Sequence, residues 1–274
     1  MTEAVSSMQA ARKLKVGDAT FALLDEGPSH GPCVVFSHSI MTTHAMWRPQ
    51  VDLLAAAGYR VVAYDARGHG DSVVSAAPYR MRGLADDVIG LLDAMGIERA
   101  HFVGLSLGGM IAFDLAARYP RRLASIVICD ARADSPESFA HPWDARIELA
   151  REQGMRSLAS PTIARWFGAG FRESEAARTI HRMICDTPVE GFIATARALQ
   201  DFDFRDALVA VSLPATLICG ANDGPLPAEM TSLSRDIPGA VLEIIPDAGH
   251  LPNVEKPAEF NAALMRHFAR LAAH

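Results

Sequence analysis

The stretch HFVGLSLGGM sets Ser106 between Gly104 and Gly108. A strand-like run precedes this motif and a helical pattern follows it, which is the setting in which a sharp turn lifts a serine hydroxyl above a sheet. Glycines suit the flanking positions because the turn leaves no space for side chains beside the serine. The N–H of Leu107 then faces the same space at the positive end of a helix, where an oxyanion is stabilised. We therefore predict that Ser106 is a nucleophile.

A serine hydroxyl is a weak nucleophile at neutral pH and needs a neighbouring base. Among the ten histidines, His250 stands out in EIIPDAGHLPNVEKP, because a strand-like run precedes it and a proline-rich stretch follows. Triads built on this kind of turn have the chain order serine, acid, histidine, which His250 fits. We predict that His250 is the general base.

An acid must hold the imidazole in the correct tautomer and stabilise the imidazolium as it forms. Asp223, in TLICGANDGPLP, follows a strand-like run and precedes His250. Asp130, in SIVICDAR, occupies the same kind of position after an earlier run and is the rival. Asp247 is interpreted as turn chemistry. We favour Asp223 and leave Asp130 as the alternative.

The stretch FSHSIMTTHAMW, from Phe36 to Trp47, carries the second candidate oxyanion donor. Many hydrolases have glycine after the histidine of such a loop, whereas here Ser39 follows His38. The donor is a backbone N–H, which we assign to Ile40, so a serine side chain leaves the chemistry intact if the backbone turns correctly. The reservation is that glycine adopts backbone angles that serine resists.

Two kinds of element must position these residues. Apolar, β-branched runs without clean alternation indicate strands buried on both faces of a mostly parallel sheet, at Cys33–Ser37, Arg60–Tyr64, His101–Gly104, Ser125–Cys129, Ala215–Cys219 and Val241–Ile245. Helical patterns lie between them at Gln50–Ala57, Arg82–Met95, Gly109–Arg118 and Pro257–Ala272. This alternation predicts an α/β fold with helices on both faces of the sheet.

One long segment interrupts the alternation. From about residue 134 to residue 206 there are helical patterns but no convincing strand. A helical insertion of this size between two strands predicts a cap over an active site. A separate helical domain is the alternative, but neither a change of composition nor a linker marks a boundary. We therefore expect a core in two parts, 1–133 and 207–274, with a helical cap at 134–206 between them.

The bulk composition excludes several classes of partner. The 274 residues are 50% hydrophobic with a net charge of −6, which indicates no nucleic-acid surface. No apolar run reaches the roughly 18 residues of a membrane span, and MTEAVSSMQAARKLKV lacks the apolar core of a signal peptide. The four cysteines form no CxxC pair, so we expect no disulfide or zinc site and a reducing cytoplasm. The oligomeric state is not indicated.

Together, the serine motif and the Asp223 and His250 segments resemble the α/β-hydrolase superfamily, from about Phe21 to the end of the chain. A serine nucleophile argues against its haloalkane dehalogenase branch, which uses aspartate. YDARGHGDS is similar to the superfamily's loop after an early strand, in which the polar residues mostly hold the loop together: Asp65, Arg67, His69 and Ser72.

A narrower resemblance is to the 3-oxoadipate enol-lactonases of aromatic degradation. SHSIMTTHAMW is similar to that family's Ser-Asn-Ser loop, GMRSLASPTIARWF to its cap, and the Asp223 and His250 segments to its acid and histidine segments. The chain departs from the family at His38 and Asp130, where asparagine is usual, and at Met41-Thr42, which replaces a Leu-Gly-Thr turn.

The resemblance implies a small lactone or ester as substrate, acyl-enzyme chemistry, and no metal or organic cofactor. An enol-lactone of this kind carries a carboxylate, and burying that charge unpaired is expensive, so a cation should meet it. Arg132, after a strand, and Arg165, in the cap, are the candidates. Trp166 would close over the ring, and Ser39 belongs to the loop that makes the resemblance selective.

Three alternatives remain open. A carboxylesterase, or a lactonase for other small acyl compounds, would use the same triad. A C–C bond hydrolase would act on a ring-fission diketone. A ligand receptor on the same fold would be non-catalytic, and the intact set of Ser106, Asp223 and His250 argues against it.

Overall fold

The computed structural model describes residues 11–272, and eight strands in that range form one sheet. Numbered β1 to β8, they span Arg12–Val16, Ala19–Glu26, Cys33–Ser37, Arg60–Tyr64, Ala100–Leu105, Leu123–Cys129, Ala215–Gly220 and Val241–Ile245. The strand order across the sheet is β1-β2-β4-β3-β5-β6-β7-β8. β1, β2 and β4 pair antiparallel, and every later pairing is parallel. The mostly parallel sheet expected from the sequence is therefore confirmed.

The six expected strands are all present, with β5, β6 and β7 somewhat longer than expected. The β1–β2 hairpin was not expected. It lies at the edge of the sheet, where β1 has the sequence RKLKV and is largely exposed. Charged edge strands resist pairing with other chains, and for the same reason β1 lacks the apolar run that identifies the buried strands.

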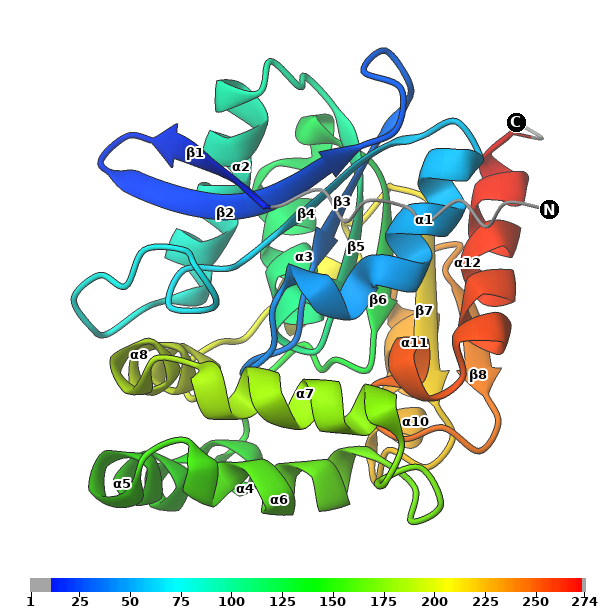
Figure 1. The fold of residues 1–274 in the computed structure, drawn as a ribbon. Helices are drawn as coiled ribbons and strands as arrows, with labels where there is room; N and C mark the ends of the chain where they lie inside the picture. Colours follow the sequence, from blue (N-terminus) through cyan, green and yellow to red (C-terminus); the bar gives the residue numbers. More distant parts are fainter. Residues whose placement is uncertain (1–10, 273–274) are drawn as a thin grey trace, which may run out of the picture.

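Helices cover both faces of the sheet (Figure 1). On one face α1 (Arg48–Ala56) and α12 (Pro257–Ala272) contact each other. The other face is covered by α2 (Met81–Ala94), α3 (Leu107–Arg118) and α10 (Leu226–Asp236). The sequence predicted four of these helices and missed α10. Short helices complete the core: η1 (His44–Trp47), η2 (Pro120–Arg122) and α11 (Pro252–Glu255).

An inserted helical cap lies between β6 and β7 in the chain. Its helices α4 to α8 span Glu137–Ala140, Pro142–Gln153, Arg156–Trp166, Glu175–Asp186 and Val189–Leu199, and α9 (Arg205–Leu208) leads back to the core. In Figure 1 the cap helices lie beyond the ends to which the arrows of β7 and β8 point. Ligands of α/β proteins bind at these carboxyl ends of the strands. Asp134 and Asp203 form a β-bridge near the two expected cap boundaries.

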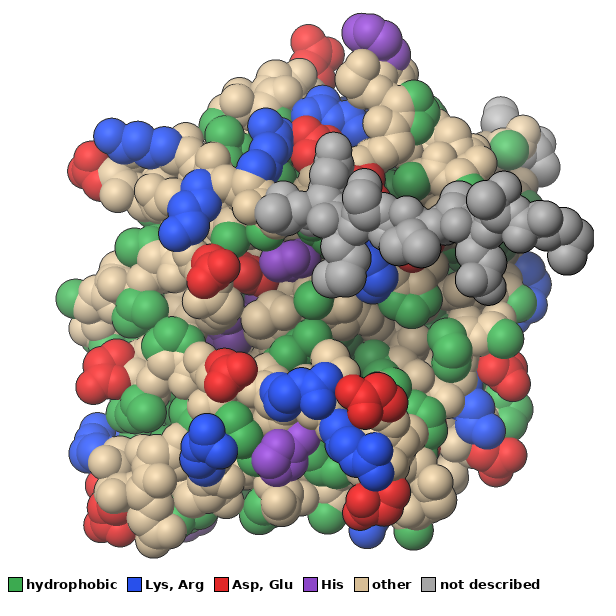
Figure 2. All heavy atoms as spheres, in the orientation of Figure 1, with side chains coloured by type: hydrophobic (Ala, Val, Ile, Leu, Met, Phe, Trp, Pro, Cys, Tyr) green, Lys and Arg blue, Asp and Glu red, His purple; other side chains and the backbone are tan. Residues whose placement is uncertain are grey.

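Burial follows the sandwich arrangement. Every residue of β3 and β7 is buried, as expected for strands with helices on both faces. All four cysteines are free thiols, and Cys185 alone is partly exposed. Acidic and basic side chains are interspersed on the face shown in Figure 2. Within residues 11–272 no helix is long and apolar enough to span a membrane. The expectation that the chain begins without a signal peptide concerns residues 1–10, which lie outside the described range.

Candidate active site

Ser106 lies in the turn between β5 and α3. Its backbone angles are φ 54° and ψ −110°, a conformation that few residues other than glycine adopt. Close packing explains the flanking glycines. A Cβ at Gly104 would lie 2.1 Å from the carbonyl oxygen of Gly108, and a Cβ at Gly108 would lie 2.2 Å from that of Ser37. The surrounding backbone thus holds the strained turn that presents Ser106 to a cavity.

His250 follows β8 and Asp223 follows β7, so both lie at the same edge of the sheet as Ser106. Nδ1 of His250 lies 2.6 Å from Oδ2 of Asp223, and both side chains are buried. This hydrogen bond places the proton on Nδ1 and leaves Nε2 free to act as a base. Burial raises the pKa of Asp223, but its interaction with His250 and then with Arg165 outweighs burial, and the pKa of Asp223 is lowered.

Asp130, the rival acid, follows β6 and is fully buried. Its Oδ1 accepts a hydrogen bond from the N–H of Gly220 at 2.9 Å, and its Oδ2 has no partner among the described residues. Burial, and then the charge of Asp223, raise the pKa of Asp130 well above its usual value. Since the hydrogen bond from His250 goes to Asp223, the geometry favours Asp223 over Asp130.

The peptide between Ser39 and Ile40 is held in a defined orientation. The Ser39 carbonyl oxygen accepts hydrogen bonds from the N–H of Thr42 at 3.2 Å, from its hydroxyl at 2.8 Å and from Nδ1 of His38 at 2.7 Å. In a trans peptide the C=O and N–H point in opposite directions, so the N–H of Ile40 points away from these groups. Ile40 itself lines the cavity that Ser106 faces.

Two backbone N–H groups near Ser106 have no protein acceptor among the hydrogen bonds of residues 11–272. One belongs to Ile40 and the other to Leu107, the first residue of α3. By contrast, the N–H of Gly108 donates to the carbonyl of His38 at 3.2 Å, which joins the loop to the serine turn. The first N–H groups of a helix lack intrahelical partners and favour anions. These two groups are therefore available for an oxyanion.

His38 holds the loop after β3, which carries Ile40, in place by two hydrogen bonds, a role that the sequence did not reveal. The ring is fully buried, Nδ1 donates to the Ser39 carbonyl, and Nε2 accepts from the N–H of Ala66 at 2.9 Å. Burial lowers the pKa of His38, so the imidazole is neutral, as one donor and one acceptor nitrogen require. His38 thus connects the loop after β3 to the loop after β4.

The concern about serine in place of glycine is resolved by the backbone. Met41, not Ser39, has the positive φ, at 62°. The Ser39 side chain is fully buried, and its hydroxyl has no partner within the described part of the chain. Ser39 is not among the described residues that line the cavity. The structure therefore places it beneath the loop, with only its carbonyl in a defined role.

The polar residues of YDARGHGDS stabilise their own loop. The hydroxyl of Ser72 donates to the carbonyl of Asp65 at 2.6 Å, and Nε of Arg67 donates to Oδ2 of Asp87 at 2.8 Å. His69 is fully buried and lies outside the set of described residues that line the cavity. Burial lowers the pKa of His69 to about 3, which makes it a poor base at neutral pH.

The cap is connected to His250 by two sets of contacts. The carbonyl of Trp166 accepts a hydrogen bond from the N–H of His250 at 2.8 Å, and the two rings lie 5.5 Å apart between centroids. The carboxylate of Glu255 accepts hydrogen bonds from the N–H of Gly168, at 2.9 Å, and from that of Gly249, at 2.7 Å. Glu255 therefore bridges the cap and the residue before His250, another role that the sequence did not reveal.

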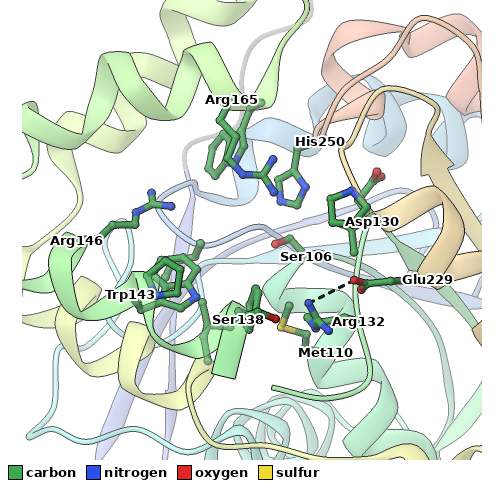
Figure 3. Close-up of a pocket in the computed structure, with 17 residues that line it drawn as sticks. Ser106, Met110, Asp130, Arg132, Ser138, Trp143, Arg146, Arg165, Glu229 and His250 are labelled. Atoms are coloured by element: carbon green, nitrogen blue, oxygen red, sulfur yellow. Dashed lines mark ion pairs between the residues drawn. The ribbon is translucent and has the colours of Figure 1, made fainter. Parts of the chain in front are cut away.

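A cavity of about 440 Å³ lies between the cap and the edge of the sheet (Figure 3). This volume is in the range of small-molecule sites. Its walls come from both parts of the protein, with Ile40, Ser106 and His250 from the core and Trp143, Arg146, Arg165 and Trp166 from the cap.

Both predicted carboxylate-binding arginines reach this cavity, but acidic side chains already face them. Nη1 of Arg165 lies 3.2 Å from Oδ1 of Asp223, and its side chain is 52% exposed. Arg132 lies 3.2 Å from Asp134 through Nη2 and 3.5 Å from Glu229 through Nη1. The structure therefore brings Arg165 into the acid–base pair rather than leaving it free in the pocket.

Arg146 is a third arginine among the described residues that line the cavity, and no sequence pattern singled it out. It belongs to PWDARIELAREQ in α5, where it resembles any charged residue of an amphipathic helix. Trp143, three residues earlier on the same side of the helix, was the available signal, because an aromatic ring and a cation at this spacing share one face.

Asp130, Asp223 and His250 each offer a ligand atom within 4.8 Å of the others, so these side chains are the ones that would hold a metal ion. The hydrogen bond of 2.6 Å between Nδ1 of His250 and Oδ2 of Asp223 already uses one of those atoms on each residue. A metal ion would also need a deprotonated Asp130, and burial opposes this by raising the pKa of that carboxyl. The chemistry of this donor set therefore fits a hydrogen-bonded acid–base pair better than a metal site.

Comparisons with known proteins agree with this arrangement. A family model described as alpha/beta hydrolase fold matches residues 32–257. The chain is 37% identical over 246 residues to 3-oxoadipate enol-lactonase 1 of Acinetobacter baylyi, covering 88% of this chain and 90% of that protein. It is 31% identical to a putative carbamate hydrolase of Variovorax paradoxus, covering 90% of this chain and 95% of that one.

Among solved structures, the enol-lactonase from Burkholderia xenovorans has a TM-score of 0.88 and 34% identity, covering 94% of this chain and 100% of that one. The protein belongs to the α/β-hydrolase family. The similarity to 3-oxoadipate enol-lactonases expected from the sequence is confirmed.

Proposed function

We propose that the protein is a serine hydrolase that opens a small enol-lactone, with Ser106 as nucleophile, His250 as base and Asp223 as acid. The observation that carries this proposal is the buried hydrogen bond of 2.6 Å between His250 and Asp223, beside a cavity into which a strained turn presents Ser106. The two enol-lactonase relatives support the substrate class.

The geometry supports a two-step reaction. Oγ of Ser106 attacks the lactone carbonyl while Nε2 of His250 takes its proton. The N–H groups of Ile40 and Leu107 receive the oxyanion, and losing one such donor costs about 3–4 kcal/mol of barrier. The ring C–O bond then breaks, the leaving enolate oxygen takes the proton from Nε2 of His250, and the resulting enol tautomerises to a ketone, which drives ring opening. Water activated by His250 hydrolyses the acyl-enzyme.

The cap completes the site in this proposal. The backbone carbonyl of Trp166 accepts the hydrogen bond of the His250 N–H, and the indole ring packs beside the imidazole. From that position the indole can cover the lactone ring and exclude water. Residues 134–206 act as the cap domain over a core of 1–133 and 207–274. No metal or organic cofactor takes part in this chemistry. The four free thiols support a reducing, cytoplasmic location.

A fluorophosphonate probe tests the nucleophile. We expect the probe to label the wild-type protein at Ser106, and the Ser106→Ala variant to remain unlabelled and inactive. Ser160→Ala, on the surface of the cap, is the matched control and should behave like the wild type. An unlabelled wild-type protein would refute every serine-hydrolase assignment.

A substrate panel tests the reaction class. It should contain an enol-lactone, simple aryl esters, an acyl-homoserine lactone, an aryl carbamate and a ring-fission diketone. Carbamate hydrolysis is the second candidate, favoured by the similarity to the Variovorax protein. We expect the highest kcat/KM for the enol-lactone. A preference for aryl esters would indicate a carboxylesterase, and cleavage of the diketone would indicate a C–C bond hydrolase.

A further inference from the structure

Asp130 is a buried carboxyl group beside the proposed triad, and the proposed mechanism does not use it. It follows β6, is fully buried, and has a backbone φ of 44°, a left-handed conformation that residues other than glycine rarely adopt. Its N–H donates to the carbonyl of Ile218 on β7 at 3.0 Å. Strained residues of this kind persist only where the surrounding structure holds them, and they cluster at functional sites. The fold thus fixes this side chain at the edge of the sheet that carries the triad.

The contacts of Asp130 match those of a protonated carboxyl group better than those of a carboxylate. Oδ1 accepts from the N–H of Gly220 at 2.9 Å, whereas no donor of the described residues reaches the buried Oδ2. Asp223 lies beside two basic groups, Nδ1 of His250 and the guanidinium of Arg165. Asp130 forms no ion pair within residues 11–272, and a buried charge without a partner is costly. A protonated carboxyl needs one donor and one acceptor as partners, and Gly220 already supplies the donor.

Asp223 supplies the acceptor that a proton on Oδ2 of Asp130 needs. One side-chain atom from each of Asp130, Asp223 and His250 lies within 4.8 Å of the other two, and all three side chains are buried. Two carboxylates that share a site repel each other strongly when both are ionised. Burial, and then the charge of Asp223, raise the pKa of Asp130, and a hydrogen bond to Asp223 acts in the same direction.

We propose that the carboxyl group of Asp130 keeps its proton and donates it in a hydrogen bond to Asp223, which makes Asp130 a positioning residue for the acid of the triad. The bond holds Asp223 with Oδ2 facing Nδ1 of His250, at 2.6 Å. It also withdraws negative charge from Asp223, so His250 returns its proton to the leaving group more readily. This inference rests on the proposed function and adds a fourth residue to its acid–base network.

The ionisable groups around Asp130 define what a titration of His250 would report. Among the described residues, those that face Asp130 or Asp223 are two thiols, one imidazole and one guanidinium: Cys129, Cys219, His250 and Arg165. Burial raises the pKa of both thiols, so neither adds a charge near neutral pH. Arg165 is present in every variant proposed below. A change in the titration of His250 on substitution of Asp130 therefore reports on Asp130 itself.

Nuclear magnetic resonance titration of the His250 imidazole tests the proposal without a substrate, with the signal assigned by its loss in His250→Gln. Asp130→Ala removes the donor to Asp223, and the midpoint of the titration should rise by about one pH unit, because the carboxylate then stabilises the imidazolium more strongly. Asp130→Asn keeps both contacts, since an amide accepts through its oxygen and donates through its nitrogen. Its midpoint should stay within about half a pH unit of the wild type.

An ionised Asp130 predicts the opposite result. Asp130→Asn would then remove a negative charge close to the imidazole, and the midpoint would fall by about two pH units. That fall, or an unchanged midpoint in Asp130→Ala, would overturn the proposal. Cys129→Ala is the matched control, because Cys129 is fully buried, precedes Asp130 and lies outside the described lining of the cavity. It should keep the wild-type midpoint, and an equal rise there would assign the effect to packing and overturn the proposal.

Infrared difference spectroscopy detects the proton itself and does not need Asp130→Ala to fold. The wild-type spectrum minus that of Asp130→Asn, at neutral pH, should contain the C=O band of a protonated carboxyl group. A difference with carboxylate bands alone would overturn the proposal.

Kinetics connect the proposal to the reaction. The acid limb of kcat/KM reports the base of the free enzyme, so in Asp130→Ala it should move up by the same one pH unit, with kcat/KM below the limb about tenfold lower. An unmoved limb would overturn the role in catalysis. The titration and the infrared spectrum need no turnover, so their failure is distinguishable from failure of the serine-hydrolase proposal, which fluorophosphonate labelling reports.

Discussion

Replacing His38 by alanine tests whether this histidine positions the oxyanion loop. The change removes the donor to the Ser39 carbonyl, at 2.7 Å, and the acceptor of the Ala66 N–H, at 2.9 Å. Both bonds are buried, so water does not readily replace them. The peptide that carries the N–H of Ile40 then loses one of its three anchors, while the two from Thr42 remain.

The expected losses of stability and of kcat follow from the two hydrogen bonds that His38→Ala removes. A buried N–H left without an acceptor costs about 1–3 kcal/mol, and the loss of a further hydrogen bond about 1 kcal/mol. We therefore expect His38→Ala to lower the free energy of unfolding by about 2–4 kcal/mol. Complete loss of an oxyanion donor lowers kcat by about 10²–10³. Because two of the three anchors of the Ser39 carbonyl remain, we expect a fall in kcat of about 10- to 100-fold.

His267→Ala is the control for a purely structural effect. His267 is also buried, with Nε2 at 2.8 Å from the hydroxyl of Ser125 and Nδ1 at 2.7 Å from that of Thr216. It lies on α12, outside the described lining of the cavity. The variant should lose comparable stability and keep its kcat.

The assay measures kcat on the best substrate of the panel, well below the thermal midpoint of each variant, with the active fraction counted by fluorophosphonate labelling. Urea unfolding gives the stability of the same samples. If His38→Ala loses no more kcat per active site than His267→Ala does, the positioning role of His38 is refuted, whatever its stability.

The remaining predictions concern the acid, the cap and pH. Asp223→Asn should lower kcat by about 10⁴, whereas Asp130→Asn should have little effect, because the hydrogen bond of His250 goes to Asp223. The reverse order, measured by steady-state kinetics, would reassign the acid. Glu255→Gln should lower the free energy of unfolding by about 1.5–3 kcal/mol, because an amide has one oxygen and cannot accept from both the Gly168 and the Gly249 N–H. An unchanged midpoint of urea unfolding would contradict the bridging role of Glu255. Burial lowers the pKa values of His69 and His267 to about 3, so the unfolded chain binds more protons below its ordinary histidine pKa. Above about pH 6.5 these two histidines do not change the free energy of unfolding. Below that pH, each lowers the free energy of unfolding by about 1.4 kcal/mol per pH unit. Urea unfolding between neutral pH and about pH 5 should show this loss, and a flat profile would contradict it.

Local sequence pattern predicted the six buried strands of the sheet and singled out the three residues of the proposed triad. Ser106, Asp223 and His250 each follow a strand-like run, and the carboxyl ends of parallel strands meet at one edge of a sheet. The apolar runs of β3 and β7 are visible because strands covered on both faces have no polar positions. The hairpin β1–β2 escaped notice because an exposed edge strand lacks that run.

Local sequence patterns do not reveal side-chain partners that are distant in the sequence. Sequence pattern indicated Arg132 and Arg165 as cations that could bind a substrate carboxylate. In the folded protein Glu229 lies beside Arg132, and Asp223 lies beside Arg165. Whether an arginine is neutralised or available depends on what packs against it, and no pattern of neighbouring residues encodes that.

By itself, the sequence determined the α/β-hydrolase class, the serine turn and the order of the proposed triad, because each depends on short-range backbone geometry and on strand burial. Only the tertiary structure decided that the His250 hydrogen bond goes to Asp223 rather than Asp130, that Glu255 joins the cap to the histidine loop, and that Arg165 pairs with Asp223. The physical reason is common to all three, since hydrogen bonds and ion pairs act over a few ångströms in space and connect segments that the chain separates widely.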